Sequence, residues 1–256
     1  MIMNSDSHDL ITAFDLPESC MVNQRVPKKL LLENGAVTAA DKRSINEGIE
    51  ELVWLAALKP ETIGVAVYRD DTHEYLEIAV LLLTLRAGAR TNRLVELVHR
   101  AIPYPVLLLT DLVVPLSLSV AHKRWSQSEA GKMVLDGDMV SVEWQEEFDA
   151  DVLADFRKSL ALGCQPRTNL QALYQGWLDT MVALNVARVT GGFVQAGTAD
   201  YAALRRDALR ECGTLQEEIV RLRSVAAKER QMPRQVELNL ELKRIEAQLA
   251  IIKQKL

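Results

Sequence analysis

Two runs of apolar residues near the C-terminus constrain the fold of this chain more than any other feature. Within each run the apolar positions are separated by alternating steps of four and three residues, the a/d seam of helices that pack along their length. One uninterrupted helix cannot carry both runs, because extending the first seam reaches Glu229 and Pro233. The first run is Ala208, Cys212, Leu215, Ile219, Leu222 and Ala226, and the second is Leu238, Leu242, Ile245, Leu249, Ile252 and Leu256.

Folding the chain back at Met232 brings the two runs into register. Every facing pair then sets an a position against a d position, as antiparallel packing requires. Pro233 suits the first turn of a second helix but not a helix interior. The pattern predicts an antiparallel coiled-coil hairpin over residues 198–256, and a single long helix, kinked at Pro233 and paired with another chain, is the alternative. The contacts predicted within one chain are Leu222 with Leu242 and Ile219 with Ile245.

Over residues 1–147 the spacing of apolar residues changes between the helical and the strand period. This pattern predicts an α/β (α+β) head with a mixed sheet. We expect residues 1–9 to be disordered. A helix that follows Pro27 and stops at Asn34-Gly35 precedes a second, capped by Thr38, whose apolar face runs from Ile45 to Ala57. Further elements are expected as strands at Thr62–Tyr68, Tyr75–Leu85, Tyr104–Leu109 and Val113–Val120, a helix at Thr91–Ala101, and a hairpin at Lys132–Trp144 turning at Asp136-Gly137-Asp138.

Residues 148–197 predict an all-helical connector between the head and the hairpin. Asp149 is expected to cap its first helix and Thr168 its second, which Gly191-Gly192 ends. Thr198 is expected to open the first helix of the hairpin.

Composition excludes several classes of protein. The net charge of -5 gives no global basic field of the kind that nucleic-acid-binding proteins carry. Three scattered cysteines suit a reducing cytoplasm. The polar N-terminus does not resemble a signal peptide, and the most apolar run, Tyr104–Ala121, is interrupted by Asp111 and two prolines, so we expect no association with a membrane.

Acidic residues near the second predicted strand suggest one enzymatic alternative. The order of elements from Thr38 to Leu109 partly matches a restriction-nuclease core, which would place Mg²⁺ ligands among Asp70, Asp71, Glu74 and Glu77. The Glu-x-Lys that such a site needs is missing, because Ile78 and Ala79 follow Glu77. The four histidines show no metal-ligand spacing. We therefore assign no catalytic, cofactor-binding or metal-binding residue.

The predicted tip of the hairpin is basic although the chain is acidic. Such a cluster favours contact with phosphates or with an acidic partner, and a solvated turn is the alternative. A second small cluster near the N-terminus carries the same two interpretations. The tip residues are Arg221, Arg223, Lys228, Arg230 and Arg234 against one acid, Glu229, and the second cluster is Arg25, Lys28 and Lys29.

Three stretches together resemble a bacterial family, domain of unknown function 4391. They are Val22-Asn23-Gln24-Arg25-Val26-Pro27-Lys28-Lys29 with Glu33-Asn34, then Ala101-Ile102-Pro103-Tyr104, and Gln235-Val236-Glu237-Leu238-Asn239 with Glu241-Leu242-Lys243. The resemblance implies a bacterial cytoplasmic protein, encoded beside DNA methyltransferases and helicases of restriction or antiviral defence clusters. It offers no catalytic residues to transfer.

These observations lead us to expect a non-catalytic accessory subunit. In this hypothesis the head docks a helicase, nuclease or methyltransferase of the same gene cluster, and the hairpin contacts DNA or another subunit. One alternative is a Mg²⁺-dependent nuclease with a degenerate restriction-endonuclease-like core. The other is a self-assembling coiled-coil protein.

Overall fold

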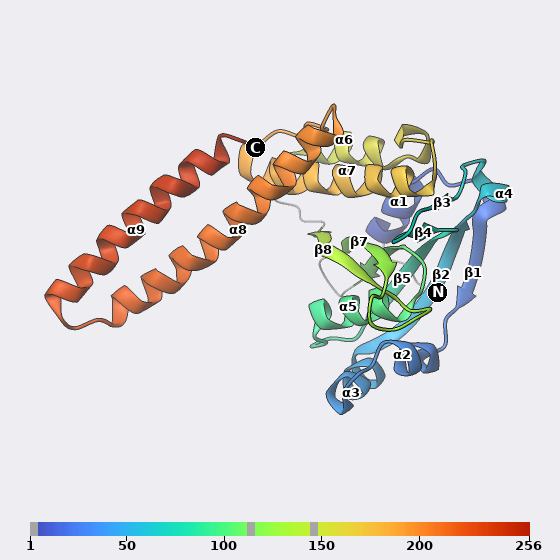
Figure 1. Ribbon diagram of the computed structural model, residues 1–256, viewed down its shortest axis with the longest axis horizontal. Coiled ribbons are helices and arrows are strands. Elements are labelled where there is room, and N and C mark those ends of the chain that lie inside the picture. The colour runs from blue at the N-terminus through green and yellow to red at the C-terminus, as the bar shows by residue number, and fades with distance from the viewer. Residues whose placement is uncertain (1–4, 112–115, 144–147) are drawn as a thin grey trace. The chain divides into compact units, whose positions relative to one another are not determined.

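The computed structural model describes residues 5–111, 116–143 and 148–256 (Figure 1). The chain divides into two compact units, Met1–Met181 and Val182–Leu256, which we call the sheet unit and the hairpin unit. Residues 148–181 of the expected connector group with the sheet, and residues 182–197 with the hairpin.

The sequence predicts a mixed sheet, and a mixed sheet of six strands forms the centre of the sheet unit. Its strand order is β1-β2-β5-β6-β7-β8, and all neighbours are antiparallel except β5 and β6. The nearly all-aliphatic β5 lies in the interior of the sheet and is almost completely buried, as a strand covered on both faces must be. The strands are β1 (Met21–Arg25), β2 (Ile49–Leu58), β5 (Ile78–Leu85), β6 (Val106–Asp111), β7 (Ser117–Trp125) and β8 (Met133–Glu143).

Helices cover both faces of this sheet (Figure 1). On one face, α2 (Lys28–Asn34), α3 (Ala39–Gly48) and α5 (Thr91–Ala101) pack with the sheet around the largest apolar cluster. The other face carries α1 (Ser5–Ala13), α6 (Ala150–Leu160) and the first part of α7 (Leu170–Thr190), whose Tyr174 and Trp177 are fully buried. Two 3-10 turns, η1 (Glu18–Cys20) and η2 (Leu162–Cys164), complete the connections.

Local capping rules account for several of these helices. Thr38 and Asp41 form the capping box that starts α3, and Asp149 caps α6, as predicted. Asn169 caps α7 in place of the expected Thr168, because its side chain accepts a hydrogen bond from the Ala172 N–H at 2.8 Å. The N-terminal expectation is corrected too, since α1 begins at Ser5; residues 1–4 lie outside the described chain.

The second predicted helix is much shorter than its apolar pattern suggested. The helix ends at Gly48, and Ile49–Leu58 is strand β2, paired with β1 and β5. The apolar residues of this run fit both the helical and the strand period. The run forms a strand because it pairs with a strand on each side. Gly48 also permits close packing, since an added Cβ would lie 2.7 Å from Leu94 Cδ1.

The strand predicted at Thr62–Tyr68 is wrong for most of its length. Pro60–Ile63 is the short helix α4, because proline fits a first helical turn and Gly64 ends it at φ +65°. Only Tyr68–Arg69 is a strand, β3, which pairs with β4 (Glu74–Tyr75).

The hairpin predicted over Lys132–Trp144 is also wrong. Met133–Glu143 is one strand, β8, which pairs with β7 through a register shift between Val120 and His122. The positive φ of Gly137, +71°, serves a bulge in this strand instead of a tight turn. Residues 113–115 of another predicted strand lie outside the described chain, and that strand is observed as β7.

The hairpin unit confirms the seam and its internal pairing. Helix α8 (Ala199–Lys228), capped by Thr198, is followed by α9 (Met232–Lys253), with Pro233 in its first turn. Leu222 and Leu242 lie in one apolar cluster with Ile219 and Ile245. A second cluster joins Ala208, Cys212 and Ile252. The two helices, about 45 and 33 Å long at 1.5 Å per residue, pair within one chain, so the single-helix alternative is wrong.

Candidate functional site

The basic residues of the hairpin tip are largely neutralised within the chain. Arg221 donates to Glu218 at 2.7 Å, Arg223 to Glu246 at 2.7 Å, and Arg234 to Glu237 at 2.8 Å. These pairs are exposed, and each contributes little to stability. They nevertheless reduce the positive field that the sequence suggested.

Lys228 and Arg230 differ from the other basic residues of the tip. Neither side chain has an ion-pair partner in the part of the chain that the structure describes. Between them, the Glu229 carboxylate accepts hydrogen bonds from the backbone N–H groups of Arg230 and Gln231 at 2.8 and 2.9 Å. The first N–H groups of α9 lie beside them, where the helix dipole favours an anion. The unneutralised charge of the tip is therefore concentrated at the turn.

The second basic cluster has mainly structural contacts. Arg25 pairs with Glu51 at 3.5 Å and Lys29 with Glu33 at 3.6 Å. The Lys28 ammonium donates to the carbonyl oxygens of Asn46 and Ile49 at the C-terminal end of α3. Partial burial lowers the pKa of Lys28. These contacts stabilise the packing of α2 beside α3, and contact of this cluster with a phosphate or an acidic partner stays a prediction.

The acidic residues of the nuclease alternative do not converge. Asp70 belongs to a turn, Glu74 pairs with Arg69 at 2.5 Å, Glu77 pairs with Lys59 at 3.1 Å, and Asp71 is exposed. Residues 5–111, 116–143 and 148–256 contain no group of three or more His, Cys, Asp or Glu side chains that could hold a metal ion. The geometry that this alternative requires is thus not found among the described residues.

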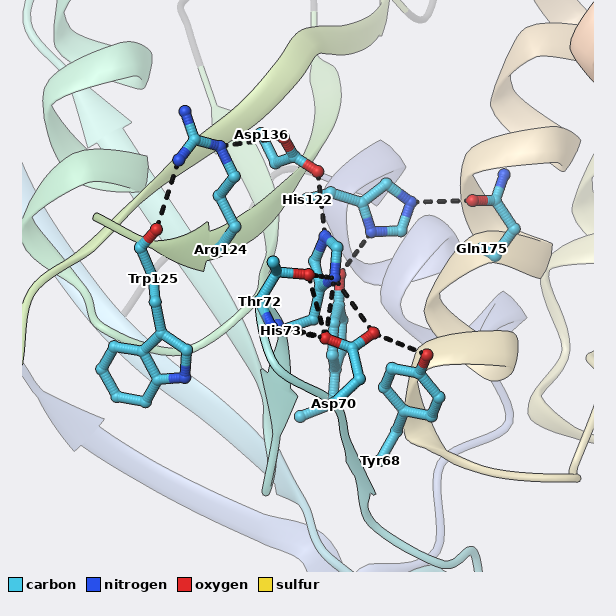
Figure 2. A network of polar contacts seen from close by, with 10 residues as sticks. Tyr68, Asp70, Thr72, His73, His122, Arg124, Trp125, Asp136 and Gln175 are labelled. Carbon is cyan, nitrogen blue, oxygen red and sulfur yellow. Dashed lines mark hydrogen bonds and ion pairs between the residues drawn. The ribbon is translucent and has the colours of Figure 1, made fainter. Parts of the chain in front are cut away.

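Asp70 is instead the centre of a polar network at the β3–β4 hairpin (Figure 2). Its Oδ1 accepts from the N–H groups of Thr72 and His73, both at 2.7 Å, and its Oδ2 accepts from the Tyr68 hydroxyl at 2.8 Å. The Thr72 N–H bond is the largest of several that hold the pKa of Asp70 well below its ordinary value. Asp70 is therefore a stable anion that shapes the turn.

His73 joins this turn to the β7–β8 strand pair. Its Nε2 lies 3.0 Å from Asp136 Oδ2, and its Nδ1 lies 3.3 Å from both oxygens of Asp70. Asp136 also forms an ion pair with Arg124, whose Nε lies 3.2 Å from Asp136 Oδ1. The hydrogen bond with Asp136, followed by the contacts with Asp70, raises the pKa of His73 against the opposing effect of burial. The arrangement favours a positive imidazolium between two carboxylates.

A second chain of hydrogen bonds begins next to this network at Tyr75. The Tyr75 hydroxyl contacts His122 Nδ1, His122 Nε2 lies 2.8 Å from Gln175 Oε1, and Gln175 donates to Asp179 at 2.9 Å. This polarity fits a His122 that carries its proton on Nε2 and accepts from Tyr75. Burial raises the pKa of Tyr75, so its hydroxyl stays protonated and connects β4 with α7 through His122.

The family of the chain follows from a match that spans most of its length. The model of the family described as Domain of unknown function (DUF4391) matches residues 14–249. The chain belongs to this family. No curated protein and no solved structure matches it. The matched region takes in the sheet, α8 and most of α9, so the hairpin is part of the DUF4391 domain.

The sheet of this DUF4391 chain also holds a buried lysine that the sequence did not reveal. Lys123 on β7 is 2% exposed and donates to the carbonyl oxygens of His99 and Ile102 at the end of α5. Burial lowers the pKa of Lys123 to about 7 and that of His99 to about 3. The lysine satisfies carbonyl groups that a helix end leaves without partners, which is a structural role.

Sequence reasoning missed the His73 network because its members are distant in the chain. His73 and Asp136 are 63 residues apart, and only the folded sheet brings them together. One local signal was present in the DUF4391 sequence. Asp70 followed by Thr72 is typical of a turn in which an aspartate side chain binds the backbone two residues on. That signal identifies the turn but not its partner on β8.

Over the three ranges that the structure describes, no helix of this DUF4391 chain combines the length and the apolar content that a bilayer-spanning helix needs.

Proposed function

We propose that this DUF4391 chain is a non-catalytic, cytoplasmic accessory subunit of a bacterial restriction or phage-defence assembly. The sheet unit docks a helicase, nuclease or methyltransferase of the same gene cluster, and the hairpin contacts a further subunit. The family resemblance suggests the setting, and the surface of the hairpin supports the role.

The observation that carries this proposal is a second apolar side on α9. The seam is already filled within the chain, yet Val236, Leu240 and Ile251 remain 54%, 63% and 59% exposed. Leu240 and Leu242 point about 200° apart at 100° per residue, so the exposed residues lie opposite the seam. A helix that is apolar on its solvent side fits docking against another protein.

Substitutions on this outer side test protein docking directly. The double variant Val236→Glu/Leu240→Glu keeps the seam and places two charges on the exposed face. With the products of the neighbouring genes co-expressed, we expect the variant to lose co-purification with the subunit that the hairpin contacts and to keep the partner that docks on the sheet unit. Val220→Glu is the matched control, because Val220 is 67% exposed on α8. Equal capture of the partners by the double variant and by the control would contradict the proposal.

A second form of the proposal adds DNA contact at the tip. It is favoured by the two basic side chains at the turn, Lys228 and Arg230, which have no ion-pair partner in the described part of the chain. Neutralising two phosphates predicts a slope of about -1.8 in the logarithm of affinity against that of salt, at about -0.9 per phosphate. We expect Lys228→Glu/Arg230→Glu to weaken DNA binding and to flatten this slope.

Lys253→Glu/Lys255→Glu, at the opposite end of α9 from the tip, makes the same number of charge reversals and so controls for the change in net charge. If the tip variant bound DNA as wild type does, DNA contact at the tip would be excluded, while docking through α9 would stand. Sedimentation tests self-assembly by comparing the mass of wild type in solution with that of Val236→Glu/Leu240→Glu. A lower mass for the variant would show that the outer face of α9 binds a second copy of the chain.

A further inference from the structure

Hydrogen bonds attach the β3–β4 hairpin to β7 and β8. The Trp125 N–H donates to the Thr72 carbonyl oxygen at 2.7 Å, and His73 Nε2 lies 3.0 Å from Asp136 Oδ2 on β8 (Figure 2). Asp136 precedes the bulged Gly137. Of these contacts, the one through His73 depends on a proton that is exchanged near neutral pH.

The turn itself does not depend on that proton. Asp70 accepts from Thr72 and His73 through backbone N–H groups, and the Asp70 N–H donates to the His73 carbonyl oxygen at 3.0 Å. Neither contact uses the imidazole. Loss of the His73 proton therefore leaves the turn formed and acts on its attachment to β8.

Deprotonation removes one of the two N–H donors of the His73 imidazolium. The imidazolium carries a proton on both nitrogens. Nε2 donates to Asp136, and Nδ1 faces the Asp70 carboxylate and the Thr72 hydroxyl. Neutral imidazole keeps one N–H. If Nε2 retains the proton, Nδ1 can accept only from the Thr72 hydroxyl, at 2.7 Å, and that hydroxyl then ceases to donate to Asp70. In either tautomer one carboxylate loses a donor, and both lose the positive charge between them.

We infer that His73 is a pH-sensitive latch, which holds the β3–β4 hairpin to β8 more strongly when protonated than when neutral. The titratable groups around it are Tyr68 and Asp70 from the hairpin, Tyr75 from β4, His122 and Arg124 from β7, and Asp136 from β8 (Figure 2). Arg124 holds Asp136 in place at either pH.

The direction of the pH effect follows from the raised pKa of His73. In the folded chain this pKa lies above the ordinary value of 6.5. The contribution of the latch is therefore complete below about pH 6.5 and is lost as the pH rises through the raised pKa. Each pH unit between the two pKa values changes the ratio of latched to unlatched chains by up to about tenfold.

Two measurements on the full chain test the latch. The first follows the His73 ring by NMR from pH 5 to 9, and we expect a pKa above 6.5. The second follows hydrogen exchange of the Trp125 N–H, corrected for the intrinsic effect of pH. We expect its protection to fall as the pH rises through the His73 pKa, by up to about tenfold for each pH unit by which that pKa exceeds 6.5, and to lose this dependence in His73→Gln.

The controls keep the inference open to refutation. His8→Gln removes an exposed histidine of α1 and should behave as wild type does. Asp136→Asn should lower the His73 pKa, and it replaces His73→Gln if that variant does not fold. A His73 pKa at or below 6.5, or equal pH dependence of Trp125 protection in wild type and His73→Gln, would overturn the inference.

Discussion

Leu222 tests how much of the hairpin's stability comes from its seam. Its side chain is 2% exposed and lies in one cluster with Leu238 and Leu242. Leu222→Ala removes three buried carbon atoms, worth about 2.4 kcal/mol at about 0.8 kcal/mol each. A remaining cavity would add to this cost, but only two helices line the seam, so neighbouring side chains and water fill part of the space. We expect the free energy of opening to fall by about 2 to 3 kcal/mol.

Native-state hydrogen exchange measures this loss in the helices themselves. A loss of 2 to 3 kcal/mol makes the amides of α8 and α9 exchange roughly 30 to 150 times faster, because about 1.4 kcal/mol corresponds to tenfold. Val220→Ala, at a 67% exposed position of the same helix, should cost less than about 0.5 kcal/mol. Leu222→Ala/Leu242→Ala should cost less than the sum of its two single changes, since they share one cavity. Equal effects of Leu222→Ala and Val220→Ala would refute the seam as the source of stability.

Two further predictions concern the ion pair between Arg93 of α5 and Asp41 of α3, and two glycines. The hydrogen bond from Arg93, the largest of several causes, holds the pKa of Asp41 to about 2, below its ordinary value of 3.8. The stability that this pair contributes should therefore be present above pH 3.8 and lost as the pH falls toward 2. Urea unfolding of Asp41→Asn should lack that loss. The same dependence of unfolding on acid pH in Asp41→Asn and in wild type would contradict the prediction. Gly213→Ala in the interior of α8 should raise stability by up to about 1 kcal/mol, whereas Gly137→Ala, at φ +71°, should lower it by about 1 kcal/mol. Thermal unfolding that ranked the two glycine variants in the opposite order would be inconsistent with these assignments.

Elements with one apolar face were predictable from the sequence. Helix α5 begins and ends at the predicted residues, Thr91 and Ala101, because a single 3.6-residue stripe specifies both type and orientation. The run from Ile49 to Leu58 was not predictable in this way. From Leu52 to Leu58 it is buried or half-buried on both faces, and such an apolar stretch without a polar side fits a helix and a strand equally well.

The candidate sites were predictable only in part. Basic residues near Met232 do lie at a helical turn, but the glutamates that neutralise Arg221, Arg223 and Arg234 became evident only with the helix surfaces in place. The His73 latch escaped prediction altogether. Its two carboxylates come from a local turn and from a bulge in a strand that sequence reasoning had divided into a hairpin.

The sequence by itself determined the hairpin of this protein and the presence of a mixed sheet, and only the tertiary structure decided the strand order, the register and the surroundings of His73. The hairpin's contacts repeat at a fixed spacing along two helices that follow each other in the chain. The spacing of apolar residues in the sequence is therefore enough to specify which residues pack together. The register of β7 with β8, and with it the meeting of His73 and Asp136, depends on strands that supply each other's hydrogen bonds across long separations. The register of a strand is therefore set by the strands beside it and cannot be read from its own sequence.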